Sequence, residues 1–367
     1  MKREKTAEST SQNMLIYLWK NTNFAVWLLV LAVFCALFCA LRSIMLPFVA
    51  GIVLGYLFDP LALRFEKMGI SRTWATILVF LIVILIMTPL LVLLIGVMNN
   101  QLSILISSVP AYAASLSKKA APLLEYLQTY FPDLDAEGIK KTLSENTAHT
   151  LKLGGKLLQS VFENSMAIVN ILSLLLIAPI VAFYMLRDWN VLAQKTKDLL
   201  PRKHKKEIEK ILKKIDAALS GFIRGQLSVC IILGVYYALS LKLVGLDLGL
   251  LVGFIAGLIS FIPYVGSITG FVLSMILAFS EFNDTAHIAA VIVVFLLGQF
   301  IEGNFLTPKL VGDKVGLHPV WVMFALLAGG ALMGFLGLMI AVPVAAVIGI
   351  LLREGIQKYK KSNLYLS

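Results

Sequence analysis

The sequence predicts an all-α, polytopic membrane protein. Apolar residues make up 59% of the 367 residues and charged residues only 14%, whereas about 25% of the residues in an ordinary soluble domain are charged. The chain carries about eight apolar runs, and a helix needs about 20 apolar residues to cross the hydrocarbon layer. This much apolar surface cannot be hidden in a soluble core, so we expect the lipid bilayer to surround it.

The apolar runs follow one another along most of the chain. They cover residues 24–41, 43–58, 74–98, 166–186, 222–244, 249–279, 286–306 and 320–352. We therefore expect a polar N-terminal tail (1–23), first membrane segments (24–98), a helical extramembrane insertion (99–165), a span (166–186), a basic amphipathic helix region (187–221), a membrane core with broken helices (222–352) and a C-terminal tail (353–367).

Basic residues predict the orientation. The net charge is +11, and residues 187–223 hold ten Lys or Arg against five acidic residues. Because cytoplasmic loops are enriched in Lys and Arg, we expect this region and both termini in the cytoplasm and the charge-neutral insertion outside. Ile208, Ile211 and Ile215 share one helical face of the basic region. That face suits either a membrane surface or packing on the bundle.

Two of the later runs are interrupted. Pro263 and Gly266 lie inside 249–279, and four glycines lie in the middle of 320–352. If 249–279 crossed once, the acidic EFND (281–284) would lie inside and Lys309 outside, against the charge bias. A turn at Pro263–Gly266, with a second in the glycine-rich run, reverses both placements. The charges therefore favour two hairpins, of a kind that can be re-entrant.

Broken helices also predict the site. Non-helical backbone at membrane depth survives beside protein or a water-filled cavity, and its freed amides and carbonyls can hold a polar solute. Intramembrane acids are costly and often functional. The candidate substrate-binding residues are Pro263, Tyr264, Gly266, Ser267, Thr269, Gln299, Glu302 and Asn304. Glu302 and Asp59 are the candidate ion-coupling carboxylates, although Glu302 lies near a span end, where it could simply reach the interface.

Other patterns have simpler interpretations. Gly245, Gly249, Gly253 and Gly257 are spaced by four, which lets helices approach closely. Arg224 lies at a span end and is expected to be an interface anchor. Asp59–Pro60 is expected to end the second span, with Asp59 capping the following helix. The four histidines are scattered, and no HExxH, GxSxG or phosphate-loop motif occurs. We therefore expect no enzyme activity, cofactor or metal, and no nucleic-acid partner.

Several segments together resemble the AI-2E family, the autoinducer-2 exporter-like permeases of bacteria. They are GYLFDPLALRFEKMGISR (55–72), APIVAFYMLRDW (178–189), IDAALSGFIRGQLSVCIILGVYYALSL (215–241), GLISFIPYVGSITG (257–270) and NFLTPKLVGDKVGLHPVWVMFALLAGGALMGFLGLMIAVPVAAV (304–347). The resemblance covers most of the chain except the N-terminal tail and the insertion. It implies a multi-span inner-membrane protein with a soluble insertion after the third span. It brings no catalytic motif.

The expected function is therefore that of a permease in a bacterial inner membrane. It would export a small polar solute, such as the quorum-sensing signal autoinducer-2, by gradient-driven or facilitated transport. One alternative is exchange of sodium or lithium for protons, which the resemblance also allows. A second is a membrane scaffold or regulator that transports nothing. The expected partners are a small polar solute or a cation and the lipid bilayer, with assembly into a homo-oligomer left open.

Overall fold

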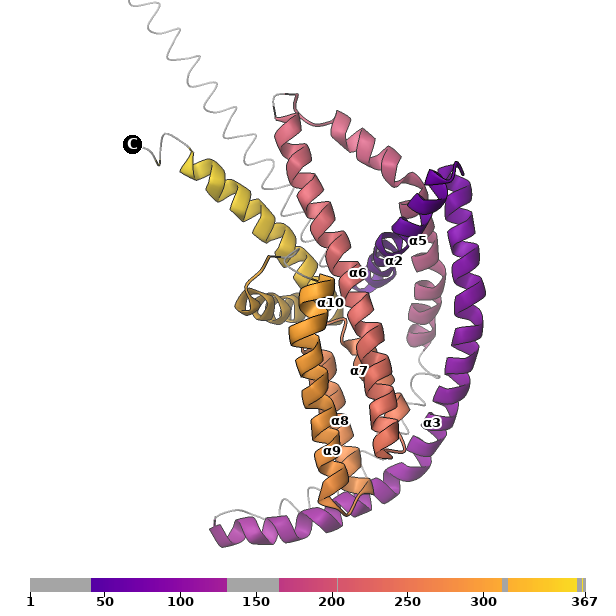
Figure 1. Ribbon diagram of the computed structural model, residues 1–367, viewed down its shortest axis with the longest axis vertical. Helices are drawn as coiled ribbons and strands as arrows, with labels where there is room; N and C mark the ends of the chain where they lie inside the picture. The colour runs from indigo at the N-terminus through magenta and orange to yellow at the C-terminus, as the bar shows by residue number, and fades with distance from the viewer. Residues whose placement is uncertain (1–40, 131–164, 203, 312–315, 362–364, 366–367) are drawn as a thin grey trace, which may run out of the picture.

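The chain is helical in the part that the structure describes, which confirms the predicted fold class. The computed structural model describes residues 41–130, 165–202, 204–311, 316–361 and 365. Its helices are α2 (Arg42–Lys67), α3 (Arg72–Tyr130), α5 (Ser165–Asp198), α6 (Lys205–Val244), α7 (Gly249–Ile259), α8 (Val265–Glu281), α9 (Thr285–Ile301), the π-helix η1 (Glu302–Val311) and α10 (Pro319–Lys360) (Figure 1). The predicted tail 1–23, nearly all of the first apolar run and residues 131–164 of the insertion lie outside the described residues.

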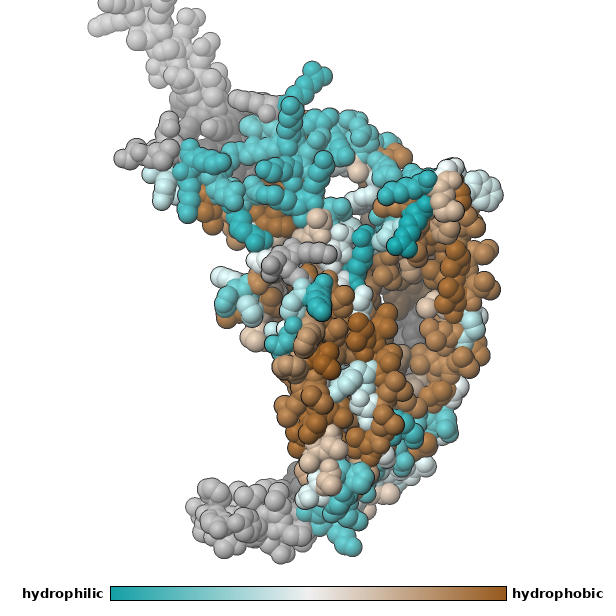
Figure 2. Space-filling model, in the orientation of Figure 1, coloured by the Kyte–Doolittle hydropathy of each residue, from teal (hydrophilic) through white to brown (hydrophobic). Residues whose placement is uncertain are grey.

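Apolar and polar residues are distributed over the surface as expected for a membrane protein. Among the described residues, six helical stretches are long and apolar enough to cross a membrane, and α7 and α8 are shorter apolar helices. Large apolar side chains such as Leu85 and Leu93 are about 70% exposed. Figure 2 shows these apolar side chains along the middle of the molecule and hydrophilic ones gathered toward its ends. The chain is a multi-pass membrane protein.

Helices α2 and α5 pack closely through glycines. A Cβ atom on Gly51 would lie 2.5 Å from Cβ of Val181, and one on Gly55 would lie 3.1 Å from Cβ of Met185. The first distance leaves no room for a side chain and the second leaves very little, so these two glycines, also four residues apart, let the backbones of α2 and α5 approach closely. A small apolar cluster that includes Val79 of α3 completes this group.

Helix α2 continues beyond the predicted end of the second span. The sequence suggests a stop at Asp59–Pro60, yet the helix runs on to Lys67 with Pro60 inside it. Pro60 has no N–H to donate to the carbonyl of Tyr56, four residues earlier. Arg224 of α6 supplies a replacement, because its Nε donates to the Tyr56 carbonyl oxygen at 3.0 Å. A contact between distant helices thus offsets the local break.

Helix α3 joins a span to the insertion without interruption. It has 59 residues, which is about 90 Å of helix, against about 30 Å of hydrocarbon. It bows around the bundle and passes beneath the ends of α8 and α9 (Figure 1). There Tyr112 donates to Glu281 at 2.7 Å and Lys119 donates to the carbonyl of Phe282 at 2.8 Å. The first part of the insertion therefore packs on the end of α8.

The run 249–279 forms a helical hairpin. Helix α7 ends at Ile259, α8 begins at Val265, and α7 and α8 lie against each other. The four-spaced glycines press α7 onto α6, since a Cβ on Gly253 would lie 2.1 Å from the amide nitrogen of Ala238. The predicted turn at Pro263 is present.

The run 320–352 also doubles back. Gly334 has φ 61° and ψ −137°, which interrupts α10. A Cβ on Gly330 would lie 3.1 Å from Cδ2 of Leu338, whereas eight residues of straight helix span about 12 Å. The chain therefore turns near Gly334, and the second predicted hairpin is present.

The two hairpins place the intervening loops at opposite ends of the molecule. Glu281 of EFND contacts Tyr112 of the insertion. Lys309 lines a cavity with Lys214 of the basic region. This is the arrangement that the charges favour: acidic EFND on the side of the insertion, and TPKL on the side of the basic helix.

The basic amphipathic region is part of α6 rather than a separate helix. Helix α6 runs for 40 residues from Lys205 into the apolar core. Lys214 pairs with Glu354, and Lys358 lies 3.2 Å from Glu207. These ion pairs tie the basic segment to the C-terminal part of α10, so of the two interpretations the structure favours packing on the bundle.

Candidate functional site

The break between α7 and α8 is a tight turn of residues 260–264. Tyr264 has φ 67°, in the left-handed region that non-glycine residues rarely adopt. Pro263 precedes it and has no backbone donor. Gly266 packs against Ser260, because a Cβ there would lie 2.3 Å from the Ser260 amide nitrogen. Three of the predicted site residues therefore shape the turn itself.

The backbone carbonyls at the turn accept hydrogen bonds from side chains of α6 and of α8. Gln226 of α6 donates from Nε2 to the Ser260 carbonyl at 2.6 Å. The Ser267 hydroxyl donates to the Tyr264 carbonyl at 3.2 Å, and the Thr269 hydroxyl donates to the Val265 carbonyl at 2.7 Å. Both hydroxyl protons are thus used inside the hairpin, and their oxygens remain able to accept. Gln226 was not among the predicted residues, since the sequence does not show which helix faces the turn.

The second predicted group lies at the junction of α9 and η1. Gln299 donates from Nε2 to Oε2 of Glu302 at 3.1 Å, and Asn304 donates from Nδ2 to the Phe300 carbonyl at 3.0 Å. Glu302 is half-buried and begins the π-helix η1, which contains Pro308. π-helical turns are rare and occur frequently at functional sites. The sequence did not predict this second irregularity, since the run 286–306 reads as an ordinary span, and the structure adds it beside Glu302.

Helix α6 contacts both groups. Gln226 holds the turn between α7 and α8, and the preceding Gly225 packs on η1, since a Cβ there would lie 2.3 Å from the Leu310 carbonyl oxygen. The carbonyl of Cys230 also lies 3.0 Å from where a Cβ on Gly257 would be. No hydrogen bond or ion pair joins the two predicted groups directly among the described residues. Two stretches of non-α backbone thus meet the same helix.

Asp59 occupies an ion-pair network. Its carboxylate lies 2.7 Å from Arg72 and 3.8 Å from Arg224. Arg72 also donates to the Leu186 carbonyl at 2.8 Å, so the network ties α2, α3, α5 and α6 together. A small cavity of about 60 Å³ adjoins Asp59 and Asp216, which is room for about two waters. This placement favours a structural role for Asp59 over ion coupling.

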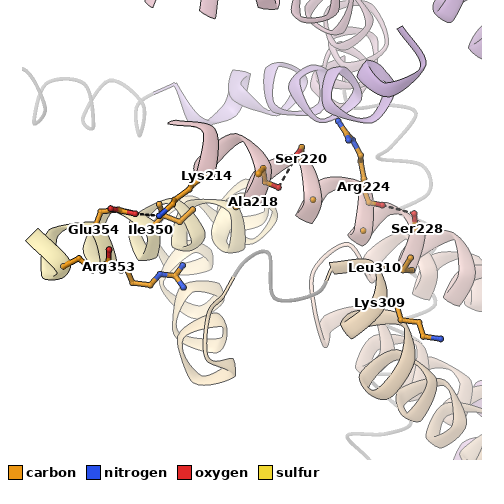
Figure 3. A pocket seen from close by; sticks show the side chains of 14 residues that line it. Lys214, Ala218, Ser220, Arg224, Ser228, Lys309, Leu310, Ile350, Arg353 and Glu354 are labelled. Atoms are coloured by element: carbon orange, nitrogen blue, oxygen red, sulfur yellow. Dashed lines mark hydrogen bonds and ion pairs between the residues drawn. The ribbon is translucent and has the colours of Figure 1, made fainter. Parts of the chain in front are cut away.

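A larger cavity lies elsewhere, between α6, η1 and α10. Its volume is about 880 Å³. Figure 3 shows the labelled residues of α10 and those of η1 on opposite sides, with α6 running past both from Lys214 to Ser228. The charged lining residues are Lys214, Arg224, Lys309, Arg353 and Glu354. From the sequence, Arg224 was interpreted as an interface anchor and Lys309 as an orientation signal. Their place in one cavity was not predicted, because no local pattern shows that residues so far apart in the chain line the same cavity.

Comparison with known proteins agrees with this architecture. The profile described as "AI-2E family transporter" matches residues 24–357. The chain belongs to the AI-2E family. "Putative transport protein YrrI" of Bacillus subtilis (strain 168) is 30% identical over 85% of this chain and 86% of that protein. "Putative permease PerM" of Escherichia coli (strain K12) is 26% identical over 83% and 86%, respectively.

A further AI-2E relative has a more specific name. "AI-2 transport protein TqsA" of Escherichia coli (strain K12) is 23% identical over 86% of this chain and 88% of that protein. As a member of the AI-2E family, the chain is a multi-pass membrane transport protein. The resemblance first seen in the five segments is confirmed along nearly the whole chain.

Proposed function

We propose that this AI-2E protein exports a small polar solute across a bacterial inner membrane, with autoinducer-2 as the first candidate. The name of TqsA supports that candidate. Transport is gradient-driven or facilitated. Both termini lie in the cytoplasm, the insertion lies outside, and the chain works in the membrane without catalysing a reaction.

One observation carries the proposed route. The turn at 260–264 and the π-helix that begins at Glu302 both contact α6. Irregular backbone at membrane depth requires polar partners or water, and it offers carbonyls and amides to a passing solute. The route therefore passes along α6, beside Pro263 and Tyr264 and then beside Gln299, Glu302 and Asn304.

Half-burial of Glu302 favours a second candidate function. Among the residues that the structure describes, its side chain accepts a hydrogen bond from an amide, Gln299, and forms no ion pair. A carboxylate in such surroundings can exchange a proton for a sodium or lithium ion. Glu302, and not Asp59, is then the coupling residue, because Asp59 already lies between two arginines.

Flux in proteoliposomes tests the proposal. Autoinducer-2 and sodium are offered separately, with and without a proton gradient, to the wild type, to Pro263→Ala and to the double variant Gln299→Ala/Asn304→Ala. Lys360→Gln, an exposed change at the end of α10, is the matched control. We expect autoinducer-2 flux that the route variants reduce and the control does not. Equal flux in all variants would contradict the route, and no wild-type flux of autoinducer-2 would contradict that solute.

Orientation is tested by labelling single cysteines in a chain from which the native cysteines have been removed. Asn283 and Lys309 are both exposed and lie at the two ends of the α9–η1 stretch. Replacement of Asn283 should react with an impermeant reagent added outside, and replacement of Lys309 should not. The reverse pattern would invert the proposed topology.

A further inference from the structure

We propose that the Tyr237 hydroxyl of α6 contacts a small, neutral, hydroxylated solute beside the Gln299–Glu302 pair. The contact lies on the proposed route and so rests on the proposed function, to which it adds a residue and a class of solute. The sequence does not single out Tyr237, since nothing in VYYALSL (235–241) shows which of the two tyrosines turns into the bundle.

The ring of Tyr237 is held in one place by α9. The side chain is fully buried and stacks on Phe295, with the ring centres 4.7 Å apart. Gly298 leaves room for the end of the ring, because a Cβ there would lie 2.5 Å from the Tyr237 hydroxyl oxygen. The hydroxyl therefore lies against the backbone of α9, about one helical turn before Glu302.

The Tyr237 hydroxyl makes no hydrogen bond there. Its oxygen is buried, and none of the described residues offers it a partner at hydrogen-bond distance. Gln299 lies close enough to interact with it without reaching that distance, and its Nε2 donates instead to Glu302 at 3.1 Å. An unsatisfied buried polar group is costly, and a hydroxyl can donate one hydrogen bond and accept two. That capacity is open to a solute.

The adjacent tyrosine shows what a structural hydroxyl does in the same helix. Tyr236 donates to the Val294 carbonyl of α9 at 3.0 Å. Tyr236 and Tyr237 thus both lie against α9, but of the two only the Tyr236 hydroxyl joins the helices. Packing accounts for the ring of Tyr237 and leaves its hydroxyl without a role in the bundle.

The chemistry around the hydroxyl defines the class of solute. The Tyr237 hydroxyl donates and accepts, whereas the Glu302 carboxylate only accepts and repels an anion. Gly298, where the hydroxyl lies, and Glu302 are four residues apart, which is about 6 Å of helix. A neutral solute of a few carbon atoms with more than one hydroxyl can bridge that distance, donating to Glu302 and exchanging a hydrogen bond with Tyr237.

Removal of single hydroxyls tests this contact, with the neighbouring tyrosine as the matched control. Thermal unfolding in detergent should show no loss of stability in Tyr237→Phe, because no hydrogen bond is broken. It should show a lower midpoint in Tyr236→Phe, which loses its bond to Val294. In proteoliposomes, the half-saturating concentration for autoinducer-2 flux should rise about fivefold in Tyr237→Phe, the size of one hydrogen bond, and stay unchanged in Tyr236→Phe.

This crossed pattern separates a solute contact from a structural bond. A midpoint lowered as far in Tyr237→Phe as in Tyr236→Phe would mean that the hydroxyl is bonded within the bundle. Unchanged half-saturation in Tyr237→Phe would mean that it meets no solute. Either result overturns the proposal.

Glycerol, a small neutral polyol, supplies a measurement that needs no transport. Because a ligand of the folded state stabilises it, glycerol should raise the unfolding midpoint of the wild type and of Tyr236→Phe more than that of Tyr237→Phe. Equal shifts in all three would overturn the contact. If the wild type carries no autoinducer-2 but shows the glycerol difference, the proposed solute is wrong and the Tyr237 contact stands.

Discussion

The Nε atom of Arg224 lies 3.0 Å from the carbonyl oxygen of Tyr56, the acceptor that Pro60 cannot satisfy. Two residues along α6, Gln226 lies 2.6 Å from the carbonyl of Ser260 at the hairpin turn. In both places a long side chain of α6 donates to a backbone carbonyl for which the interrupted helix provides no backbone N–H. Lipid provides no such donor, so a membrane protein must supply it internally.

Loss of the Gln226 amide should destabilise the protein. In Gln226→Leu the buried Ser260 carbonyl loses its donor, and an unsatisfied buried acceptor costs about 1–3 kcal/mol. Gln194→Leu makes the same chemical change at an exposed position of α5 and should have little effect. Thermal unfolding in detergent compares the two. Equal midpoints would mean that the hydrogen bond does not support the turn.

The glycines of α7 should not tolerate a methyl group. A Cβ on Gly257 would lie 2.2 Å from Cα of Gly234, so Gly257→Ala must push α7 away from α6, at about 1–3 kcal/mol. Gly355 has nothing within 4 Å of such a Cβ, and Gly355→Ala should stabilise α10 by about 0.5–1 kcal/mol. Opposite signs are expected in the same unfolding assay, and a stabilised Gly257→Ala would contradict the observed packing.

The backbone of Tyr264 should prefer glycine to alanine. At φ 67° a side chain costs about 1–2 kcal/mol in the left-handed region. Tyr264→Gly should therefore be more stable than Tyr264→Ala by about 1 kcal/mol, although both lose the ring. Chemical or thermal unfolding of the two variants gives the difference directly. If alanine were the more stable replacement, the turn would not have this conformation.

The contact of the insertion with α8 should be broken by Tyr112→Phe. The Tyr112 hydroxyl donates to Glu281, which also accepts from the Asp247 amide at 3.1 Å. Loss of one such bond should raise local opening of α3 about fivefold, for about 1 kcal/mol, as read by hydrogen exchange near residue 112. Tyr184→Phe, at an exposed tyrosine, is the control. Unchanged exchange in Tyr112→Phe would show that the contact does not hold this part of α3.

The same contact has a predictable pH dependence. Burial, followed by the hydrogen bond to Glu281, raises the pKa of Tyr112 above its ordinary value. Because the pKa is raised in the folded state, the contribution of this hydrogen bond to stability is fully present below the unfolded-state pKa of about 10. It is lost only as the pH rises through the folded-state pKa. Protection of this part of α3 should therefore be constant from about pH 7 to about pH 9. Loss of protection within that range would show that the hydroxyl does not make this contact.

Glu302 and Asp59 should separate the two transport mechanisms. If protons are exchanged for sodium, Glu302→Gln should abolish pH-dependent sodium flux in vesicles, because the amide cannot titrate. Asp59→Asn should instead lower stability, since Arg224 loses its charged partner and Arg72 keeps only Glu66, and should leave the coupling of any remaining flux intact. Retained pH-dependent sodium flux in Glu302→Gln would exclude Glu302 as the coupling residue.

The two hairpins show how much of the fold local sequence can predict. Pro263 with Gly266, and the glycines around Gly334, predict interruptions because their backbone preferences are local properties of the chain. The same reasoning predicted that the second span ends at Pro60, which is wrong for the helix, because α2 continues to Lys67. Pro60 lies inside a helix, where Arg224, 164 residues later in the chain, donates to the Tyr56 carbonyl that Pro60 leaves without a backbone donor. A proline therefore marks a possible break, and the surrounding helices determine whether the break occurs.

The sequence by itself determined the membrane class, the family, the two hairpins and the side on which basic residues gather. These features depend on composition, on charge between the apolar runs and on residues with special backbone preferences. Only the tertiary structure decided that Asp59 lies in an ion-pair network, that Gln226 holds the turn, and that Lys214, Lys309 and Arg353 line one cavity. Those relationships join residues far apart in the chain, and they arise because apolar helices in lipid must satisfy each other's polar groups.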